Sequence, residues 1–176
     1  MAPSHIAILL STWNGATFLP EQLASFLRLS GPEWRLYWRD DGSDDRSADI
    51  VRAFADGPGA GLVIERNDNR GRVGITASFL TLLRLAPEGA VVAFADQYDV
   101  WLPEKLARGV DALGRVQNGT PALYCARQSL VNATLRPIKL SATISEPPGF
   151  PQAGASRSGH KACTARHAAP QRRSCQ

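Results

Sequence analysis

Acidic residues gather in two segments of this chain, and each segment follows a short apolar run. The segment DDGSD occupies positions 40–44, and the segment DQYD occupies positions 96–99. A carboxylate at the end of a strand can accept a hydrogen bond from a base N–H or a ribose hydroxyl, and two carboxylates can hold Mg²⁺ or Mn²⁺ against a diphosphate. The two segments therefore suit a nucleotide that carries a diphosphate. The alternative is that residues 40–44 only build a turn and cap the next helix.

Several other site signatures are absent from the sequence. It contains neither Gly-x-Gly-x-x-Gly, nor the P-loop pattern Gly-x-x-x-x-Gly-Lys-Ser/Thr, nor Gly-x-Ser-x-Gly. The glycine-rich segment 57–61 precedes a strand-like run instead of opening a helix, so we interpret it as a loop. The histidines, His5, His160 and His167, are in the wrong places for a catalytic triad. These observations argue against a dinucleotide-dependent dehydrogenase, a P-loop NTPase and a triad hydrolase.

The rest of the chain supplies the elements that must position the acids. Apolar runs predict strands at His5–Leu10, Arg35–Arg39, Leu62–Ile64, Ala90–Ala95 and Ala122–Cys125. Helical periodicity predicts four helices between them, with apolar faces at Leu19, Leu23, Phe26 and Leu27, at Ile50, Val51 and Phe54 behind a Ser47 cap, at residues 77–85, and at Leu106, Val110 and Leu113 after Pro103. This alternation predicts an α/β fold with a largely parallel sheet and helices on both faces. Ligands bind such sheets at the carboxyl ends of the strands, where both acidic segments lie.

The basic charge of the chain is confined to its last residues. The sequence pI is about 9.3, and the chain holds 20 Lys and Arg against 16 Asp and Glu. Five of the bases and none of the acids lie in residues 151–176, so the first 150 residues carry a net charge of −1. The body therefore has no electrostatic footprint for nucleic acid. We expect no nucleic-acid partner.

The segment 151–176 also differs in composition from the body. It contains no Leu, Ile, Val, Phe, Trp, Tyr or Met, so we expect it to add neither a strand nor an amphipathic helix to the core. Two interpretations stay open. The segment is either a natural disordered basic tail or the product of an out-of-frame reading of a GC-rich gene. The predicted organisation is thus a domain at 1–150 and a tail at 151–176.

Targeting signals are not recognisable in the sequence. No apolar run approaches the roughly 20 residues that span a bilayer, and the first residues lack the basic region and cleavage site of a signal peptide. The cysteines Cys125, Cys163 and Cys175 have neither pairing nor metal-site spacing. We therefore expect a cytoplasmic protein with no transmembrane segment.

Four segments together resemble the family 2 glycosyltransferases. They are ILLSTWNG at 8–15, EQL at 21–23, RDDGSD at 39–44 and FADQYDVWLPEKL at 94–106. Their order and spacing are similar to those of bacterial rhamnosyltransferase-like members that build cell-surface polysaccharides. The resemblance covers residues 5–150, and it implies a GT-A type fold with a Rossmann-type, nucleotide-binding sheet.

The resemblance also implies roles for residues at the strand ends. Ser11 and Trp13 would line the base pocket, with the Trp ring on the base. Asp41 would accept the N3–H of a pyrimidine. Arg70 and Arg72 would approach the diphosphate, although two arginines on a loop can also be surface residues without a specific role.

The second acidic segment departs from the family pattern. By resemblance, Asp96 would lie near the ribose or the diphosphate, and members commonly have Asp-x-Asp-Asp here, with a metal-binding carboxylate at the third position. This chain has Tyr98 at that position. A neutral phenol is a poor ligand for Mg²⁺ or Mn²⁺, the cofactors that the family implies. Asp96 and Asp99 remain as candidate metal ligands, unless Asp99 only caps the loop.

The resemblance implies an acceptor region that we cannot assign. Members continue for about another hundred residues, which carry the acceptor pocket and the carboxylate that deprotonates the acceptor hydroxyl. We therefore expect residues 1–150 to be an incomplete, donor-binding domain whose C-terminal half is missing. No catalytic base can be named within it.

The sequence thus favours a glycosyltransferase-like protein with weak or no activity. Its expected partners are a nucleotide diphosphate sugar, with dTDP-rhamnose as one candidate, and a glycan or lipid-linked acceptor at the inner face of the membrane. The main rival is a non-catalytic nucleotide-binding remnant or interaction module, which an exposed apolar sheet edge would favour.

Overall fold

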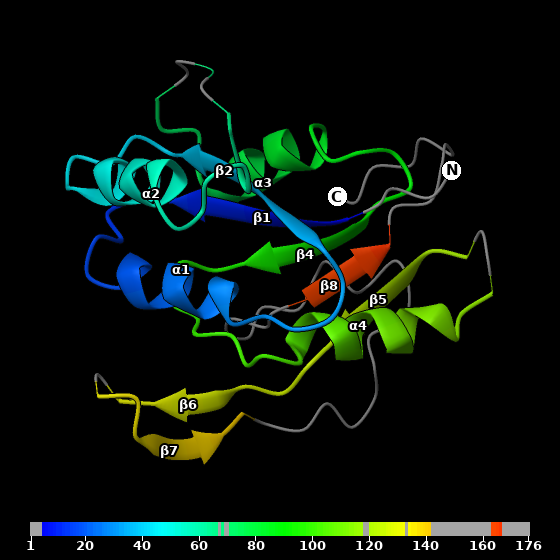
Figure 1. Cartoon of the computed structure of the whole chain (residues 1–176). Coiled ribbons are helices and arrows are strands. Elements are labelled where there is room, and N and C mark those ends of the chain that lie inside the picture. Colours follow the sequence, from blue (N-terminus) through cyan, green and yellow to red (C-terminus); the bar gives the residue numbers. More distant parts are fainter. Residues whose placement is uncertain are drawn as a thin grey trace.

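A computed structural model describes residues 5–66, 68, 71–117, 120–132 and 134–141, and the backbone of 163–166. In chain order its elements are β1 (Ile6–Thr12), α1 (Leu19–Leu27), β2 (Trp34–Asp40), α2 (Ser47–Asp56), β3 (Val63–Glu65), α3 (Ile75–Leu83), β4 (Val91–Ala95), α4 (Lys105–Gly114), β5 (Ala122–Cys125), β6 (Ser129–Val131), β7 (Pro137–Leu140) and β8 (Cys163–Arg166). Six strands form one sheet in the order β3-β2-β1-β4-β8-β5, and β6 and β7 form a separate antiparallel pair (Figure 1).

Strand β1 lies inside the sheet, between the parallel strands β2 and β4. The register pairs Ser11 with Arg39 and Thr12 with Asp40, so β1 and β2 end at the same level. The arrowheads of β1, β2 and β4 lie on the left side of the sheet in Figure 1. We call this side, with the loops 13–18, 41–46 and 96–101 that follow the three strands, the carboxyl edge.

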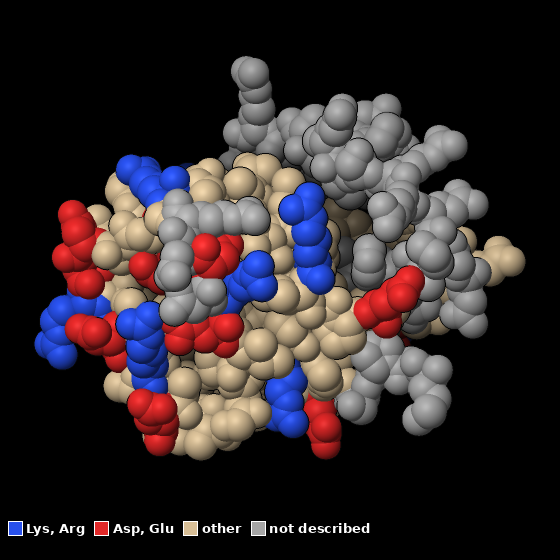
Figure 2. All heavy atoms as spheres, turned by 90° about the horizontal axis from the view of Figure 1, so that it is seen from above, with Lys and Arg blue, Asp and Glu red and all other residues tan. Residues whose placement is uncertain are grey.

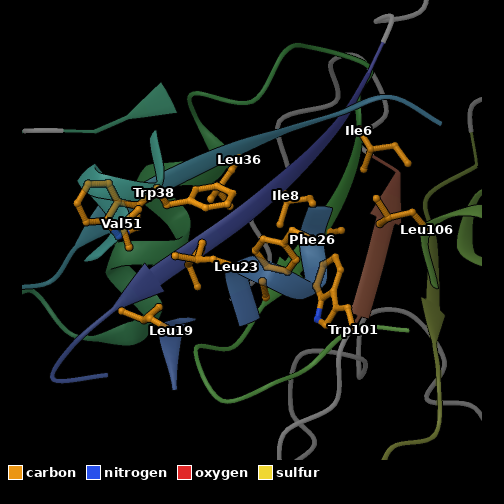
Figure 3. Close-up of a cluster of buried hydrophobic side chains, with 14 residues drawn as sticks. Ile6, Ile8, Leu19, Leu23, Phe26, Leu36, Trp38, Val51, Trp101 and Leu106 are labelled. Carbon is orange, nitrogen blue, oxygen red and sulfur yellow. The ribbon is translucent and has the colours of Figure 1, made fainter. Parts of the chain in front are cut away.

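Strand β1 is buried on both of its faces, as is usual for an inner strand of a parallel sheet. Ile6, Ile8 and Leu10 pack in a layer with side chains of α1, α2 and α4 (Figure 3). Ala7 and Leu9 pack in a second layer, to which α3 contributes. Complete burial of a Leu or Ile side chain contributes about 1.5–3 kcal/mol. The prediction of an α/β sheet with helices on both faces is confirmed.

Two details of the predicted helices are wrong. Leu27 ends α1 and is 44% exposed, because it follows Phe26 by one position and the chain turns it about 100° away from the buried face. Ser47 does not cap α2, since its side chain makes no cap hydrogen bond and it is the first residue of the helix. Asp45 instead accepts the hydrogen bond from the Ser47 N–H (2.8 Å).

The segment 151–176 does contribute a strand, contrary to the sequence-based prediction. Residues Cys163–Arg166 form β8, which pairs antiparallel with both β4 and β5. Strand pairing satisfies main-chain N–H and C=O groups and does not require apolar side chains, so hydropathy could not reveal it. The predictions of disorder and of an out-of-frame reading for the rest of this segment lie outside the described residues.

Strands β6 and β7 were not expected from the sequence. They pair antiparallel, their strand residues are all exposed, and the register is irregular between Leu130 and Val131. On the face of the molecule seen in Figure 2, acidic and basic side chains lie interspersed.

No helix within the described part of the chain is long and apolar enough to cross a membrane.

Candidate functional site

Hydrogen bonds join the loops after β1 and β2. The Asn14 N–H donates to Ser43 Oγ (3.0 Å), and Asn14 Oδ1 accepts from the Asp44 N–H (3.0 Å). The Ala16 N–H donates to Asp45 Oδ2 (3.0 Å). Asn14 has a φ of 48°, a left-handed conformation that Asn adopts more readily than most residues. The two loops therefore form one connected part of the carboxyl edge.

Asp40 holds the turn that begins the loop after β2. Its Oδ2 accepts from the Ser43 N–H (2.8 Å), and its Oδ1 accepts from the hydroxyls of Ser43 (2.6 Å) and Thr12 (2.9 Å). The Thr12 hydroxyl in turn accepts from the indole N–H of the buried Trp38 (3.0 Å). Asp40 thus performs the turn-building role that the alternative interpretation of residues 40–44 proposed.

Asp45 orders the next turn. Burial acts to raise the pKa of its carboxyl, but hydrogen bonds from the Ser47 hydroxyl and from the N–H groups of Ala16 and Ser47 outweigh it and lower the pKa below its ordinary value. The negative charge also lies just before the N-terminus of α2, where the helix dipole favours it. Asp45 therefore stabilises the start of α2 and the contact with the loop after β1.

Asp41 is buried, and its carboxylate binds the loop that precedes α3. Its Oδ1 accepts from Arg39 Nη1 (2.5 Å) and from the Val73 N–H (2.8 Å), and its Oδ2 accepts from the Gly74 N–H (2.8 Å). A carboxylate oxygen can accept two hydrogen bonds, so Oδ2, with one bond from a described residue, has the capacity for another. Asp41 is 4% exposed, which places this carboxylate in a region of weak solvent screening.

Arg39 links the carboxyl edge to α3 from inside the protein. Its side chain is 1% exposed, and its Nε donates to Asp68 Oδ1 (3.3 Å). Its Nη2 donates to the Gly71 carbonyl (2.7 Å), and its Nη1 donates to Ser78 Oγ (3.2 Å). The Ser11 hydroxyl joins the same network by donating to Ser78 Oγ (2.6 Å). Two carboxylates and several neutral acceptors thus balance a buried guanidinium, as burial of a charge requires.

Trp13 and Arg72 form a stacked pair at the surface of the carboxyl edge. The guanidinium carbon of Arg72 lies 3.7 Å from the centre of the Trp13 ring, which is within the range of a cation–π contact. Trp13 is 41% exposed. Arg72 lies between Gly71, which binds Arg39, and Val73, which binds Asp41, so the buried network also holds the Arg72 backbone. Arg70 lies outside the described residues.

The loop after β4 contacts the loop after β1 through Gln97. Its carboxamide accepts from the Trp13 N–H (2.9 Å) and donates to the Trp13 carbonyl (2.9 Å). Gln97 is 5% exposed, and it is the most buried residue of the segment DQYD. All three loops of the carboxyl edge are therefore joined by direct hydrogen bonds.

The acidic residues of the loop after β4 are arranged around a tight turn. The Asp96 carbonyl accepts from the Asp99 N–H (3.1 Å) and from the side chain of the buried Gln22. The Asp99 carboxylate accepts from Gln128 Nε2 (3.4 Å). The Tyr98 ring packs edge to face on Phe18 with 5.1 Å between ring centres, and Tyr98 is 49% exposed.

A divalent cation is a poor fit to this arrangement. Tyr98 presents a phenol in place of a carboxylate, and its ring lies against Phe18. Within the described residues, no group of three or more His, Cys, Asp and Glu side chains is placed to hold a metal ion. The assignment of Asp96 and Asp99 as metal ligands therefore stays a prediction.

Sequence reasoning missed the residues that hold the site together. Arg39 offered a signal, because a charged residue at the end of a buried strand must have partners. The sequence contains no signal for its partners Asp68 and Ser78, since their distance from Arg39 depends on how α3 packs. Gln97 was not predicted because it is an uncharged residue beside acids, and the sequence does not show that its amide is buried and needs partners.

Comparison with known proteins places the chain among glycosyltransferases. The model of the family described as "Glycosyl transferase family 2" matches residues 7–174. An uncharacterized glycosyltransferase of Nostoc sp. is 32% identical over 107 residues, which are 60% of this chain and 32% of that protein. The chain spans about a third of the length of this curated relative.

Solved structures of two glycosyltransferases share the fold. TarS of S. aureus, residues 1–349 in complex with UDP-GlcNAc, is 21% identical with a TM-score of 0.53, covering 61% of this chain and 31% of that one. The mannosyltransferase PcManGT of Pyrobaculum calidifontis, in complex with GDP-Man and Mn²⁺, is 24% identical with a TM-score of 0.57, covering 68% of this chain and 34% of that one. At these identities the likeness shows the fold alone.

Proposed function

The chain belongs to glycosyl transferase family 2, and we propose from this that its carboxyl edge binds the nucleotide diphosphate of a sugar donor. One observation carries the proposal. A continuous series of contacts joins an exposed aromatic ring, a cation and a buried carboxylate: Arg72 covers Trp13, and the adjacent Val73 N–H binds Asp41. These three groups have the chemistry to contact a base face, a diphosphate and a base N–H.

The carboxylate of Asp41 would select the base. Because a carboxylate only accepts hydrogen bonds, it favours a base edge that donates, such as N3–H of uracil and thymine or N1–H of guanine. Cytosine has an acceptor at N3, which the carboxylate would repel. Two structures similar to this chain are complexes with UDP-GlcNAc and with GDP-Man, and the bases of both ligands carry such a donor.

Trp13 and Arg72 would hold the remaining parts of the nucleotide. Stacking of a base on an aromatic ring is worth about 1–3 kcal/mol. The Arg72 guanidinium can form paired hydrogen bonds with phosphate oxygens, which Lys cannot do with the same geometry. Arg72 already covers the Trp13 ring, so its guanidinium would move toward the diphosphate or the base would use the free part of the ring.

We further propose the reaction of the whole protein as transfer of the sugar to a hydroxyl of a glycan or lipid-linked glycan. The bond from the anomeric carbon to the diphosphate breaks, a bond to the acceptor oxygen forms, and a base takes the acceptor proton. dTDP-rhamnose and cell-surface polysaccharide are our candidates for donor and product. With Tyr98 in place of a carboxylate, we propose weak nucleotide binding that depends little on Mn²⁺.

Calorimetric titration of the full chain with UDP, dTDP, GDP and CDP tests this proposal. We expect UDP or dTDP to bind at least tenfold more tightly than CDP, and Asp41→Asn to remove this preference. Asn is chosen because it has a similar shape to Asp. The matched control is Asp44→Asn, the same change at an exposed residue of the same loop. Equal binding of UDP and CDP, or no binding of any nucleotide, would contradict the proposal.

A specific observation also supports the rival function as an interaction module. Leu130 and Val131 of β6 are each 40% exposed, and Ile138 and Leu140 of β7 are 66% and 59% exposed. Such an apolar hairpin is a favourable surface for another protein segment. If this is the main function, Ile138→Lys will abolish self-association in size-exclusion chromatography with light scattering and leave UDP binding unchanged.

A further inference from the structure

The segment DQYD contains a buried amide whose function the acids around it do not explain. Gln97 reaches from the end of β4 to the residue that follows β1, and both polar atoms of its carboxamide bind the main chain of Trp13. We propose that Gln97 is the positioning residue for Trp13 and thereby fixes the ring against which the base of the nucleotide binds. This inference rests on the proposed function.

The chemistry of the contact requires a carboxamide. The Trp13 N–H needs an acceptor and the Trp13 carbonyl needs a donor, and the side chains of Gln and Asn alone offer both on neighbouring atoms in a fixed plane. Asn is one methylene shorter. Glu would retain the acceptor for the N–H but would place a second oxygen against the carbonyl. The two hydrogen bonds of 2.9 Å therefore hold both polar groups of the Trp13 main chain.

The local backbone is adapted to this contact at Gly15. A Cβ atom added to Gly15 would lie 2.4 Å from Gln97 Oε1, closer than non-bonded atoms approach. The Gly15 N–H donates to Ser47 Oγ (2.8 Å), which holds the glycine backbone at this place. A glycine therefore leaves the space that the Gln97 side chain fills.

The contact determines where the Trp13 ring can lie. The ring is 41% exposed, so packing against the protein leaves much of it unconstrained, and Arg72 contacts it from an exposed loop position. An aromatic ring stacks well on a base only within a narrow range of distance and tilt. Fixing the main chain of Trp13 narrows the orientations of the ring before the nucleotide arrives, which reduces the entropic cost of binding.

The test compares Gln97→Met with the wild-type full chain. Met has a similar length and removes both hydrogen bonds. We expect hydrogen exchange of the Trp13 N–H to become at least tenfold faster and the affinity for UDP to fall by about five- to tenfold. Binding of inorganic pyrophosphate, which lacks a base, should stay within twofold of wild type, a distinction that general destabilisation would not produce.

Two further variants complete the design. Gly15→Ala should displace the Gln97 side chain and so reproduce the loss of UDP affinity, although residue 97 stays Gln. This variant keeps the proposal testable if Gln97→Met does not fold. Gln117→Met makes the same chemical change at an exposed residue beyond α4 and should match wild type in every measurement.

The outcomes separate this inference from the proposed function. If Gln97→Met leaves both Trp13 exchange and UDP affinity within twofold of wild type, Gln97 does not position Trp13. If wild type binds no nucleotide, the proposed function fails, and Trp13 exchange alone decides whether Gln97 holds this residue. If pyrophosphate affinity falls as much as UDP affinity, the effect is not specific to the base and the proposal is overturned.

Discussion

The two acidic segments look alike in the sequence and behave differently in the structure. At the end of β2, the carboxylates of Asp40 and Asp41, with that of Asp45 just beyond the segment, each accept hydrogen bonds that define the backbone around them. In the segment DQYD after β4, the most buried side chain is the neutral Gln97, and the aromatic Tyr98 packs on Phe18. Carboxylates therefore hold the first segment in place, whereas the carboxamide of Gln97 and the ring of Tyr98 hold the second.

This difference shows that an acidic pattern alone does not separate ligand-binding residues from structural ones. Asp41 is the informative case, because its carboxylate binds the loop before α3 and is also the group that we propose to accept a base N–H. A residue with both roles couples the folding of the site to its chemistry. The following predictions test the contrast between the segments, beginning with the largest effect.

The Arg39→Met substitution should cause the largest loss of stability. It leaves the buried carboxylates of Asp41 and Asp68 without their shared cation. Removal of one partner from a buried ion pair costs about 3–5 kcal/mol. Urea unfolding monitored by circular dichroism measures the free energy of unfolding.

A matched surface pair provides the control for Arg39. Arg115 pairs with Asp111 at 2.6 Å, but both side chains are largely exposed. Arg115→Met should therefore change the free energy of unfolding by no more than about 0.5 kcal/mol. Equal effects of the two substitutions would show that the segment after β2 is not held together by buried charge.

The Tyr98→Asp substitution should make the second segment resemble an acidic cation site. The carboxylate would stand between Asp96 and Asp99, and we expect Mn²⁺ to raise the affinity for UDP about tenfold in this variant and less than twofold in wild type. Loss of the contact with Phe18 should cost about 0.5–1.5 kcal/mol of stability. Titrations with and without Mn²⁺ measure the first effect.

The control for this variant is Tyr98→Phe, which retains the ring and lacks the carboxylate. It should show the weak Mn²⁺ dependence of wild type. Tight binding of UDP that already requires Mn²⁺ in wild type would refute our interpretation of Tyr98.

The smallest effect concerns Asp45 and pH. Because the pKa of Asp45 is lowered in the folded state, its charge stabilises the fold above the unfolded-state pKa of about 3.9, and this contribution disappears as pH falls through the lower folded-state value. Asp45→Asn removes the charge and keeps an acceptor. The stability difference between wild type and this variant should be constant above about pH 5 and shrink below pH 4. A difference that stays constant down to pH 3 would show that the charge is unimportant.

Periodicity and turn residues were enough to predict β1 to β5 and the layers around them. These elements place side chains such as Ile8 and Phe26 in the core, and burial of side chains is what hydropathy measures. Strands β6 and β7 were not predicted because their residues are exposed. Strand β8 was not predicted because main-chain pairing leaves no apolar pattern in the sequence. Prediction therefore succeeded where packing determines structure.

The site was predictable only in part for a related physical reason. Trp13 and Asp41 could be placed at strand ends from the local sequence. The partners that orient them come from distant parts of the chain: Gln97 for Trp13, and the N–H groups of Val73 and Gly74 for Asp41. Hydrogen bonds between such separated residues depend on tertiary packing, which a single sequence does not display.

The position of β8 in the sheet has a consequence for the order in which the chain folds during synthesis. Strands β1 to β4 form three parallel pairs with one another, and these pairs can form once Ala95 has left the ribosome. Among the strands that the structure describes, β5 contacts this sheet through β8 alone, and residues 126–162 are translated between β5 and β8. Until β8 arrives, one edge of β4 has no partner strand in the sheet and can pair with another nascent chain. Because this edge closes late, we expect slower translation of residues 126–162 to increase aggregation of the nascent chain.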